Sequence, residues 1–157
     1  MAEERMMLSA CLAGVRCVYD GSHKRRPALA ALVRRKKAVL FCPEQLGGFA
    51  VPHPASEIRG GDGADVLAGR ARVVSRTGED VTELFLRGAA AALRQARKNG
   101  IRRAVMKARS PSCGCGKIYD GTFTRCLRDG DGVTAALLKK QGIEVVTDEE
   151  FLGIRQR

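Results

Sequence analysis

Tryptophan is absent from the 157-residue sequence, and aromatic residues make up only 4% of it. A surface that binds single-stranded RNA by stacking needs several aromatic rings, so this composition weakens the case for such a platform. The longest apolar stretches run only a handful of residues. They fall far short of the roughly 20 residues that cross a bilayer, and we therefore expect no membrane partner.

The N-terminus lacks the features of a secretory signal. Residues 1–5 include two glutamates, and the apolar run that follows them is short. A signal would need a basic start, a long apolar segment and a cleavage site of small residues, so we expect a cytoplasmic protein. In that reducing compartment, the six cysteines are better explained as metal ligands or nucleophiles than as disulfides.

Acidic residues are outnumbered by basic ones, 17 to 28, and the formal net charge is +11. Such a charge attracts anionic partners, for example a phosphate-bearing small molecule or an RNA. Much of it lies in residues 34–37 and 94–103, where it also fits solvated helix faces and helix ends. Both interpretations stay open at this point.

Strand and helix patterns alternate along the chain. The apolar runs predict strands at about residues 6–10, 38–41, 101–106 and 144–147, with an edge strand at 70–75. Helices are predicted over residues 27–33, from an N-cap at Asp80 to Asn99, and over residues 131–138. This alternation favours an α/β fold, a Rossmann-like three-layer sandwich with a mostly parallel central sheet. The length fits a single domain over residues 1–157.

Residues 43–69 are rich in glycine and proline, which predicts a long ordered loop. Loops of this kind usually carry function. The one internal repetition is a Tyr-Asp-Gly tripeptide at residues 19–21 and 119–121, which holds the only two tyrosines of the chain.

Three cysteines follow predicted strands. Cys11 and Cys42 come directly after the first and second strands, and Cys113 lies a few residues beyond the third. The carboxyl ends of parallel strands lie along the same edge of a sheet, so we expect the three thiols to meet in one crevice. Glycine and proline surround all three, which favours functional loops over core positions. Three soft sulfur ligands together predict a metal centre.

The cysteine spacing favours an iron-sulfur cluster over zinc. Cys11 and Cys17 are separated by five residues, and Cys113 and Cys115 by one, which is a poor match to paired zinc ligands. A cluster tolerates irregular spacing because its own sulfides set the geometry. Cys17 and Cys115 stay open as a fourth ligand, while Cys126 is best explained as a small buried hydrophobe. With three ligands only, one iron keeps an open position and acts as a Lewis acid.

The neighbouring residues suggest a reaction centre. Glu44, two residues after Cys42, is a candidate general acid or base, and the alternative is a surface glutamate at a loop start. Ser110 is a candidate for orienting substrate or water, and the alternative is a turn residue before proline. Lys107 and Arg109 either contact an anion or are solvated.

Four segments, taken in this order along the chain, resemble the bacterial thiouracil desulfidase family. They are residues 9–21, residues 42–48, residues 109–114 with 118–123, and residues 130–138. The resemblance covers nearly the whole chain, and several motifs in the right order are far more specific than one short pattern.

This resemblance implies a [4Fe-4S] cofactor held by Cys11, Cys42 and Cys113, with the fourth iron free to take sulfur from the substrate. It also implies that Glu44 and Ser110 are catalytic. The implied reaction is a non-redox, hydrolytic exchange of sulfur for oxygen on thiouracil or a thiouridine nucleotide. Water activated by Glu44 would attack the carbon of the thiocarbonyl.

Two features depart from the family pattern. His53 stands where relatives usually have arginine, and Cys115 adds a thiol close to Cys113. Relatives that act on thiolated tRNA carry an additional domain, so we expect a free base or nucleotide as substrate. The alternatives are a desulfidase acting on thiolated tRNA, and an RNA-binding or metal-binding module.

Overall fold

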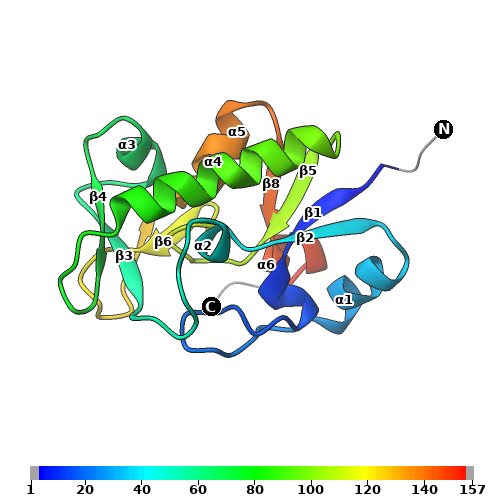
Figure 1. The fold of residues 1–157 in the computed structure, drawn as a ribbon, viewed down its shortest axis with the longest axis horizontal. Helices are drawn as coiled ribbons and strands as arrows, with labels where there is room; N and C mark the ends of the chain where they lie inside the picture. The colour runs from blue at the N-terminus through cyan, green and yellow to red at the C-terminus, as the bar shows by residue number, and fades with distance from the viewer. Residues whose placement is uncertain (1–3, 155–157) are drawn as a thin grey trace.

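A computed structural model describes residues 4–154, and its centre is a sheet of four parallel strands (Figure 1). The strands lie in the order β2-β1-β5-β8. Their bounds are β1 Met6–Ser9, β2 Ala38–Phe41, β5 Arg103–Met106 and β8 Glu144–Thr147. In the register of the sheet, Leu8 lies between Leu40 and Val105. All four strands were predicted: β2 and β8 have the predicted bounds, β1 ends one residue earlier and β5 begins two residues later.

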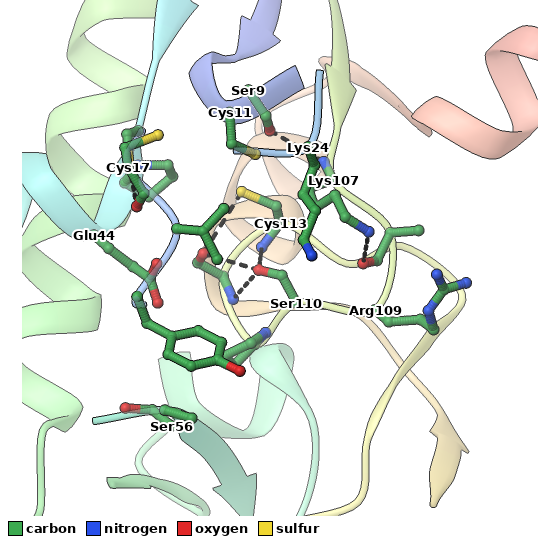
Figure 2. Close-up of a pocket in the computed structure, with 18 of the residues that line it drawn as sticks. Ser9, Cys11, Cys17, Lys24, Glu44, Ser56, Lys107, Arg109, Ser110 and Cys113 are labelled. Atoms are coloured by element: carbon green, nitrogen blue, oxygen red, sulfur yellow. Dashed lines mark hydrogen bonds between the residues drawn. The ribbon is translucent and has the colours of Figure 1, made fainter. Parts of the chain in front are cut away.

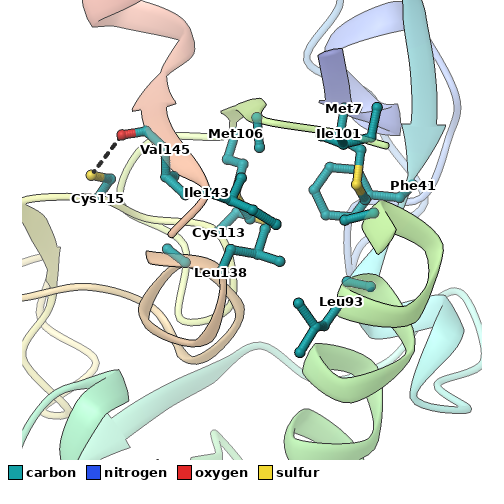
Figure 3. Close-up of a cluster of buried hydrophobic side chains, with 14 residues drawn as sticks. Met7, Phe41, Leu93, Ile101, Met106, Cys113, Cys115, Leu138, Ile143 and Val145 are labelled. Atoms are coloured by element: carbon teal, nitrogen blue, oxygen red, sulfur yellow. Dashed lines mark hydrogen bonds between the residues drawn. The ribbon is translucent and has the colours of Figure 1, made fainter. Parts of the chain in front are cut away.

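Helices cover both faces of this sheet. The helices α4 (Thr82–Lys98) and α5 (Val133–Lys140) pack on one face, and α1 (Pro27–Arg34) and α6 (Asp148–Leu152) pack on the other. Met7 and Leu8 are adjacent and fully buried, but each joins a different hydrophobic cluster because successive strand side chains point to opposite faces. Figure 3 shows the Met7 cluster, with Leu93 and Leu138 supplied by the helices. The predicted three-layer α/β fold is confirmed.

Close backbone packing joins α4 to α2, a short helix over Pro43–Leu46. A Cβ atom added to Gly88 of α4 would lie 2.0 Å from the Pro43 carbonyl oxygen. One added to Gly47 would lie 2.1 Å from the Leu84 carbonyl oxygen. Only glycine permits this approach, because real Cβ contacts stay beyond about 3 Å. The packing fixes the segment that follows β2 against a long helix.

The helix predicted from an N-cap at Asp80 to Asn99 is present as α4. Phe85, Gly88, Ala92 and Ala96 are buried, whereas the N-cap is Val81 instead of Asp80. The Asp80 carboxylate nevertheless accepts a hydrogen bond from the first helical amide, at 3.0 Å.

The prediction of one long loop over residues 43–69 is wrong. The segment contains α2, the strand β3 (Ser56–Arg59) and the helix α3 (Gly63–Leu67). β3 pairs antiparallel with β4 (Arg72–Ser75), the predicted edge strand, in a separate two-stranded sheet. Each element has only four or five residues, too few to produce a readable periodicity among glycines and prolines.

Four further elements were not predicted. They are the 3-10 helix η1 (Ala10–Ala13), the antiparallel pair β6 (Lys117–Tyr119) and β7 (Leu127–Asp129), and α6. Within residues 4–154, no helix combines the length and the hydropathy needed to cross a bilayer.

Candidate active site

A cavity of about 600 Å³ opens at the carboxyl ends of the parallel strands. Residues following β1, β2, β5 and β8 line it, and loops from β3 and β6 form its further wall. The chain runs from β1 to β2 on one side of the sheet and later returns to place β5 on the other side. Ligand sites in open parallel sheets lie at such a switch in strand order.

The three cysteines predicted to act together line this cavity. Cys11 lies in η1, Cys42 is the N-cap residue of α2, and Cys113 follows the loop after β5. Cys17 lines the same cavity, and the Cys42 thiol lies 3.9 Å from the Cys17 carbonyl oxygen. Figure 2 shows Cys11, Cys17 and Cys113 around the upper part of the cavity. The structure therefore brings the three together, while their role as ligands stays a prediction.

These thiols oppose one another's ionisation. The hydrogen bond with Cys11 raises the pKa of Cys17 to about 12, and the hydrogen bond with Cys17 raises the pKa of Cys42. Burial raises the pKa of Cys113 to about 11. Metals bind the thiolate form, and coordination removes the thiol proton outright. A positively charged group in the cavity would thus stabilise the thiolate forms, which burial and the hydrogen bonds between the thiols disfavour.

The other two cysteines lie elsewhere. Cys115 is buried in the hydrophobic core, and its thiol donates to the Val145 carbonyl oxygen at 3.6 Å (Figure 3). It does not line the cavity, so it is not placed to act as a fourth ligand. Cys126 is exposed, and its predicted burial is wrong because β7, which follows it, lies wholly exposed on the surface.

Glu44 lies in the first turn of α2, and its carboxylate points into the cavity (Figure 2). Burial raises the pKa of this carboxyl to about 7. The alternative of a solvated surface glutamate is therefore not supported. A half-buried carboxyl of this kind exchanges protons near neutral pH.

Ser110 holds the loop that carries Cys113. Its hydroxyl oxygen accepts hydrogen bonds from the amides of Ser112, at 3.1 Å, and Cys113, at 2.9 Å. Arg109 immediately before it has a φ of 69°, an unusual value for a residue other than glycine. The serine is thus a turn residue that also lines the cavity. Its hydroxyl also lies 3.1 Å from the Ser112 hydroxyl, whose own proton is directed at the Cys113 sulfur.

Two of the basic side chains at the cavity have ion-pair partners. Arg26 contacts Asp148 at 3.1 Å, and Arg109 contacts Glu149 at 2.7 Å. Lys107 differs, because within residues 4–154 its ammonium group donates to the Ala108 carbonyl oxygen, at 3.1 Å, and has no ion-pair partner. The sequence left the roles of Lys107 and Arg109 open, and the structure gives these two side chains different surroundings. Further basic side chains line the cavity, namely Lys24, Arg25, Arg76 and Arg125.

Sequence reasoning missed the wall opposite the cysteines. Glu57 of β3 accepts hydrogen bonds from the amides of Gly121, at 2.9 Å, and Phe123, at 3.2 Å. The Arg76 guanidinium lies 5.4 Å from the centre of the Phe123 ring. These contacts hold the β6–β7 loop over the cavity, with Arg125 in its lining.

The repeated tripeptide was the one available signal for this wall. Tyr19 and Tyr119 both line the cavity. Asp20 and Asp120 each accept a hydrogen bond, at 3.0 Å, from the amide two residues later. The same turn is therefore used twice at one site.

Comparison with known proteins identifies the family. The model of the 2-thiouracil desulfurase family matches residues 6–150. The chain belongs to this family. A similar solved structure is that of the [4Fe-4S]-dependent thiouracil desulfidase TudS (DUF523Vcz), with 40% sequence identity and a TM-score of 0.85. The match covers 97% of this chain and 95% of that one.

A second relative of this desulfurase is the uncharacterized protein YbbK of Bacillus subtilis (strain 168). It is 48% identical over 149 residues, which are 95% of this chain and 99% of that protein. Membership of a desulfurase family makes the chain an enzyme, and the predicted resemblance is confirmed.

Proposed function

We propose that this desulfurase uses a [4Fe-4S] cluster to remove sulfur from thiouracil or a thiouridine nucleotide, by non-redox hydrolytic exchange of sulfur for oxygen. Cys11, Cys42 and Cys113 hold the cluster. The observation that carries the proposal is the meeting of these three thiols with the Glu44 carboxyl at one cavity. The likeness to TudS, a [4Fe-4S]-dependent enzyme, supports the cofactor.

The donor set fits a cluster better than a single ion. Within residues 4–154, no three His, Cys, Asp or Glu side chains are arranged to hold a metal ion. A single ion needs all its sulfur ligands about 2.3 Å away from one point. A cluster instead takes each thiolate on a different iron, so its ligands stand further apart. Cys17 is the one additional thiol that lines the cavity.

When bound, the cluster supplies a Lewis-acidic iron that accepts sulfur. The protein supplies the proton transfers. The Glu44 carboxylate takes a proton from water as the oxygen of that water bonds to the thiocarbonyl carbon, and the carbon–sulfur double bond becomes single. Glu44 gives this proton to the sulfur, and then takes the second water proton from the new hydroxyl as the carbonyl forms and the carbon–sulfur bond breaks. Thiocarbonyl and water thus become carbonyl, hydrosulfide and one proton held by Glu44. Ser110 orients the substrate or the water, and its hydroxyl turns from the Ser112 hydroxyl, at 3.1 Å, to do so.

The wall opposite the cysteines is suited to bind the sugar and phosphate of a nucleotide. Arg76 and Arg125 line the cavity there, and no carboxylate lies within 4.0 Å of either guanidinium in the described part of the chain. Arginine recognises phosphate through paired, charge-assisted hydrogen bonds. With its sulfur beside the cysteines, a thiouridine nucleotide would extend its sugar and phosphate toward this wall.

Anaerobic purification tests the proposal. We expect a brown protein with about four iron and four acid-labile sulfide atoms per chain, which converts thiouracil or thiouridine monophosphate to the oxygen analogue with release of sulfide. Cys11→Ser, Cys42→Ser or Cys113→Ser should abolish iron binding, whereas Cys126→Ser should leave it intact. A colourless, iron-free protein that still desulfurates would refute the cofactor assignment. A fully loaded protein without turnover would refute the reaction.

A further inference from the structure

Asp148 is a fully buried carboxylate at the start of α6. Each of its two oxygens binds a different part of the chain. Oδ1 accepts a hydrogen bond from the Ala108 amide at 2.9 Å, and Oδ2 lies 3.1 Å from both Nε and a terminal nitrogen of Arg26. A buried carboxylate is costly unless a cation and hydrogen-bond donors compensate it. Both are supplied here, so the carboxylate holds the two segments together.

The Arg26 side of this contact leads to Cys11. Arg26 is the N-cap residue of α1, and its amide donates to the Leu12 carbonyl oxygen at 2.8 Å. Two residues earlier, the Lys24 amide donates to the Cys11 carbonyl oxygen at 2.9 Å. The segment that leads into α1 is therefore bonded to η1, which carries Cys11. Because Asp148 fixes the Arg26 side chain, it limits how far this segment moves.

The Ala108 side leads to Cys113. Ala108 is buried and lies at the start of the turn in which the Ser110 hydroxyl accepts a hydrogen bond from the Cys113 amide, at 2.9 Å. Glu149, the next residue of α6, binds the guanidinium of Arg109 at 2.7 Å. The start of α6 therefore holds two consecutive residues of the turn that leads to this cysteine.

Two of the three proposed cluster ligands thus depend on one side chain. Cys11 and Cys113 follow the neighbouring strands β1 and β5, but the paired residues of these strands end at Leu8 and Val105, before either thiol is reached. A site whose ligands are already in place binds its ligand group with less loss of conformational freedom. We propose that Asp148 is a positioning residue, which fixes the spacing of Cys11 and Cys113 before the cluster binds. This inference rests on the proposed function.

Alkylation of cluster-free protein, kept reduced and anaerobic, tests the proposal without turnover. Buried thiols react with iodoacetamide only when the chain around them opens, and mass spectrometry gives a rate for each cysteine. Arg26→Met should speed the alkylation of Cys11 about tenfold or more, the range of a hydrogen bond to a charged group, and leave Cys113 near its wild-type rate. Asp148→Ala removes both contacts and should speed both cysteines.

Three comparisons separate positioning from general stability. Arg26→Lys keeps the charge and should retain most of the protection of Cys11. Asp62→Ala removes the side-chain cap of α3, where Asp62 accepts a hydrogen bond from the Asp65 amide at 3.2 Å. It should lower the melting temperature and leave the alkylation rates of both ligand cysteines unchanged. Cys126 is exposed, so its alkylation reports the rate of the chemical step itself.

Iron release from the anaerobic holoenzyme gives a second readout. A chelator should remove iron fastest from Asp148→Ala, more slowly from Arg26→Met, and at the wild-type rate from Asp62→Ala. The Arg26 side chain is 33% exposed, so Arg26→Met leaves less buried surface unfilled than a change in the core would. If Asp148→Ala does not fold, Arg26→Met and Arg26→Lys carry the comparison.

Two outcomes would overturn the proposal. One is an alkylation rate of Cys11 that Arg26→Met leaves unchanged. The other is that Asp148→Ala speeds Cys115, in the hydrophobic core, as much as Cys11, since this would mean that the whole fold loosens. A wild-type protein that takes up no iron would refute the proposed function, and the alkylation rates would still show whether Asp148 holds the two thiols.

Discussion

Replacing Gly88 by alanine tests whether the contact between α4 and α2 positions the site. In an exposed helix, this change would stabilise the protein by about 1 kcal/mol through helix propensity. Here the new Cβ would lie 2.0 Å from the Pro43 carbonyl oxygen and 2.9 Å from its carbonyl carbon. Both are backbone atoms, so α2 must shift by about 1 Å to restore an ordinary contact.

Overpacking costs about 1–3 kcal/mol, and a clash with backbone belongs at the upper end of that range. After the gain in propensity, we expect Gly88→Ala to lower the free energy of unfolding by about 1–2 kcal/mol. For a domain of this length that is a fall in melting temperature of about 2–8 °C. Because Pro43 lies between Cys42 and Glu44, the displaced helix should also lower iron content and turnover.

Thermal unfolding and iron analysis measure the two effects on the same preparation. Ala90→Gly, at a half-buried position of α4, is the matched control. It should lose about 1 kcal/mol through propensity while keeping its iron. A Gly88→Ala protein more stable than wild type, or one as unstable as expected but with full iron and activity, would contradict the role of this contact.

The remaining predictions concern the cavity itself. Glu44→Gln should keep the cluster colour and lower turnover about 100-fold or more, measured anaerobically; full activity would dismiss the proposed base. Ser110→Ala leaves the amides of Ser112 and Cys113 without their acceptor, so unfolding free energy should fall by about 1 kcal/mol and the midpoint of iron loss to a chelator should shift down. Arg76→Met should raise KM for thiouridine monophosphate about three- to tenfold and leave KM for free thiouracil unchanged. Desulfuration of small substrates should depend only modestly on salt, whereas a steep fall in RNA affinity with salt would favour the RNA-binding alternative.

The parallel sheet and the meeting of the cysteines were predictable because both follow from local signals. Apolar runs mark the four strands, and the carboxyl ends of parallel strands share one edge. Residues that directly follow those strands, such as Cys11 and Cys42, therefore had to lie close together. Glu44 was predictable for the same reason, since it lies two residues after Cys42.

The positions of the other three cysteines, which do not directly follow a strand, were not predictable in this way. Cys17 and Cys115 were equivalent candidates in the sequence, yet Cys17 lines the cavity and Cys115 packs against Val145 in the core. Which way each thiol points depends on how its loop packs against distant elements, and no local pattern records this. The exposure of Cys126 has the same origin, because β7, which follows it, is exposed along its whole length.

The sequence by itself determined the fold class, the family, and the meeting of the three cysteines and Glu44 at one cavity. Each of these depends on periodicity or on short motifs in a set order. Only the tertiary structure decided the further wall of Glu57, Arg76 and Tyr119, and the contact of Asp148 with Arg26. The physical reason is that these features arise from contacts between segments far apart in the chain. Glu57 bonds to a loop 64 residues away, and Asp148 binds Arg26, which lies 122 residues earlier in the chain.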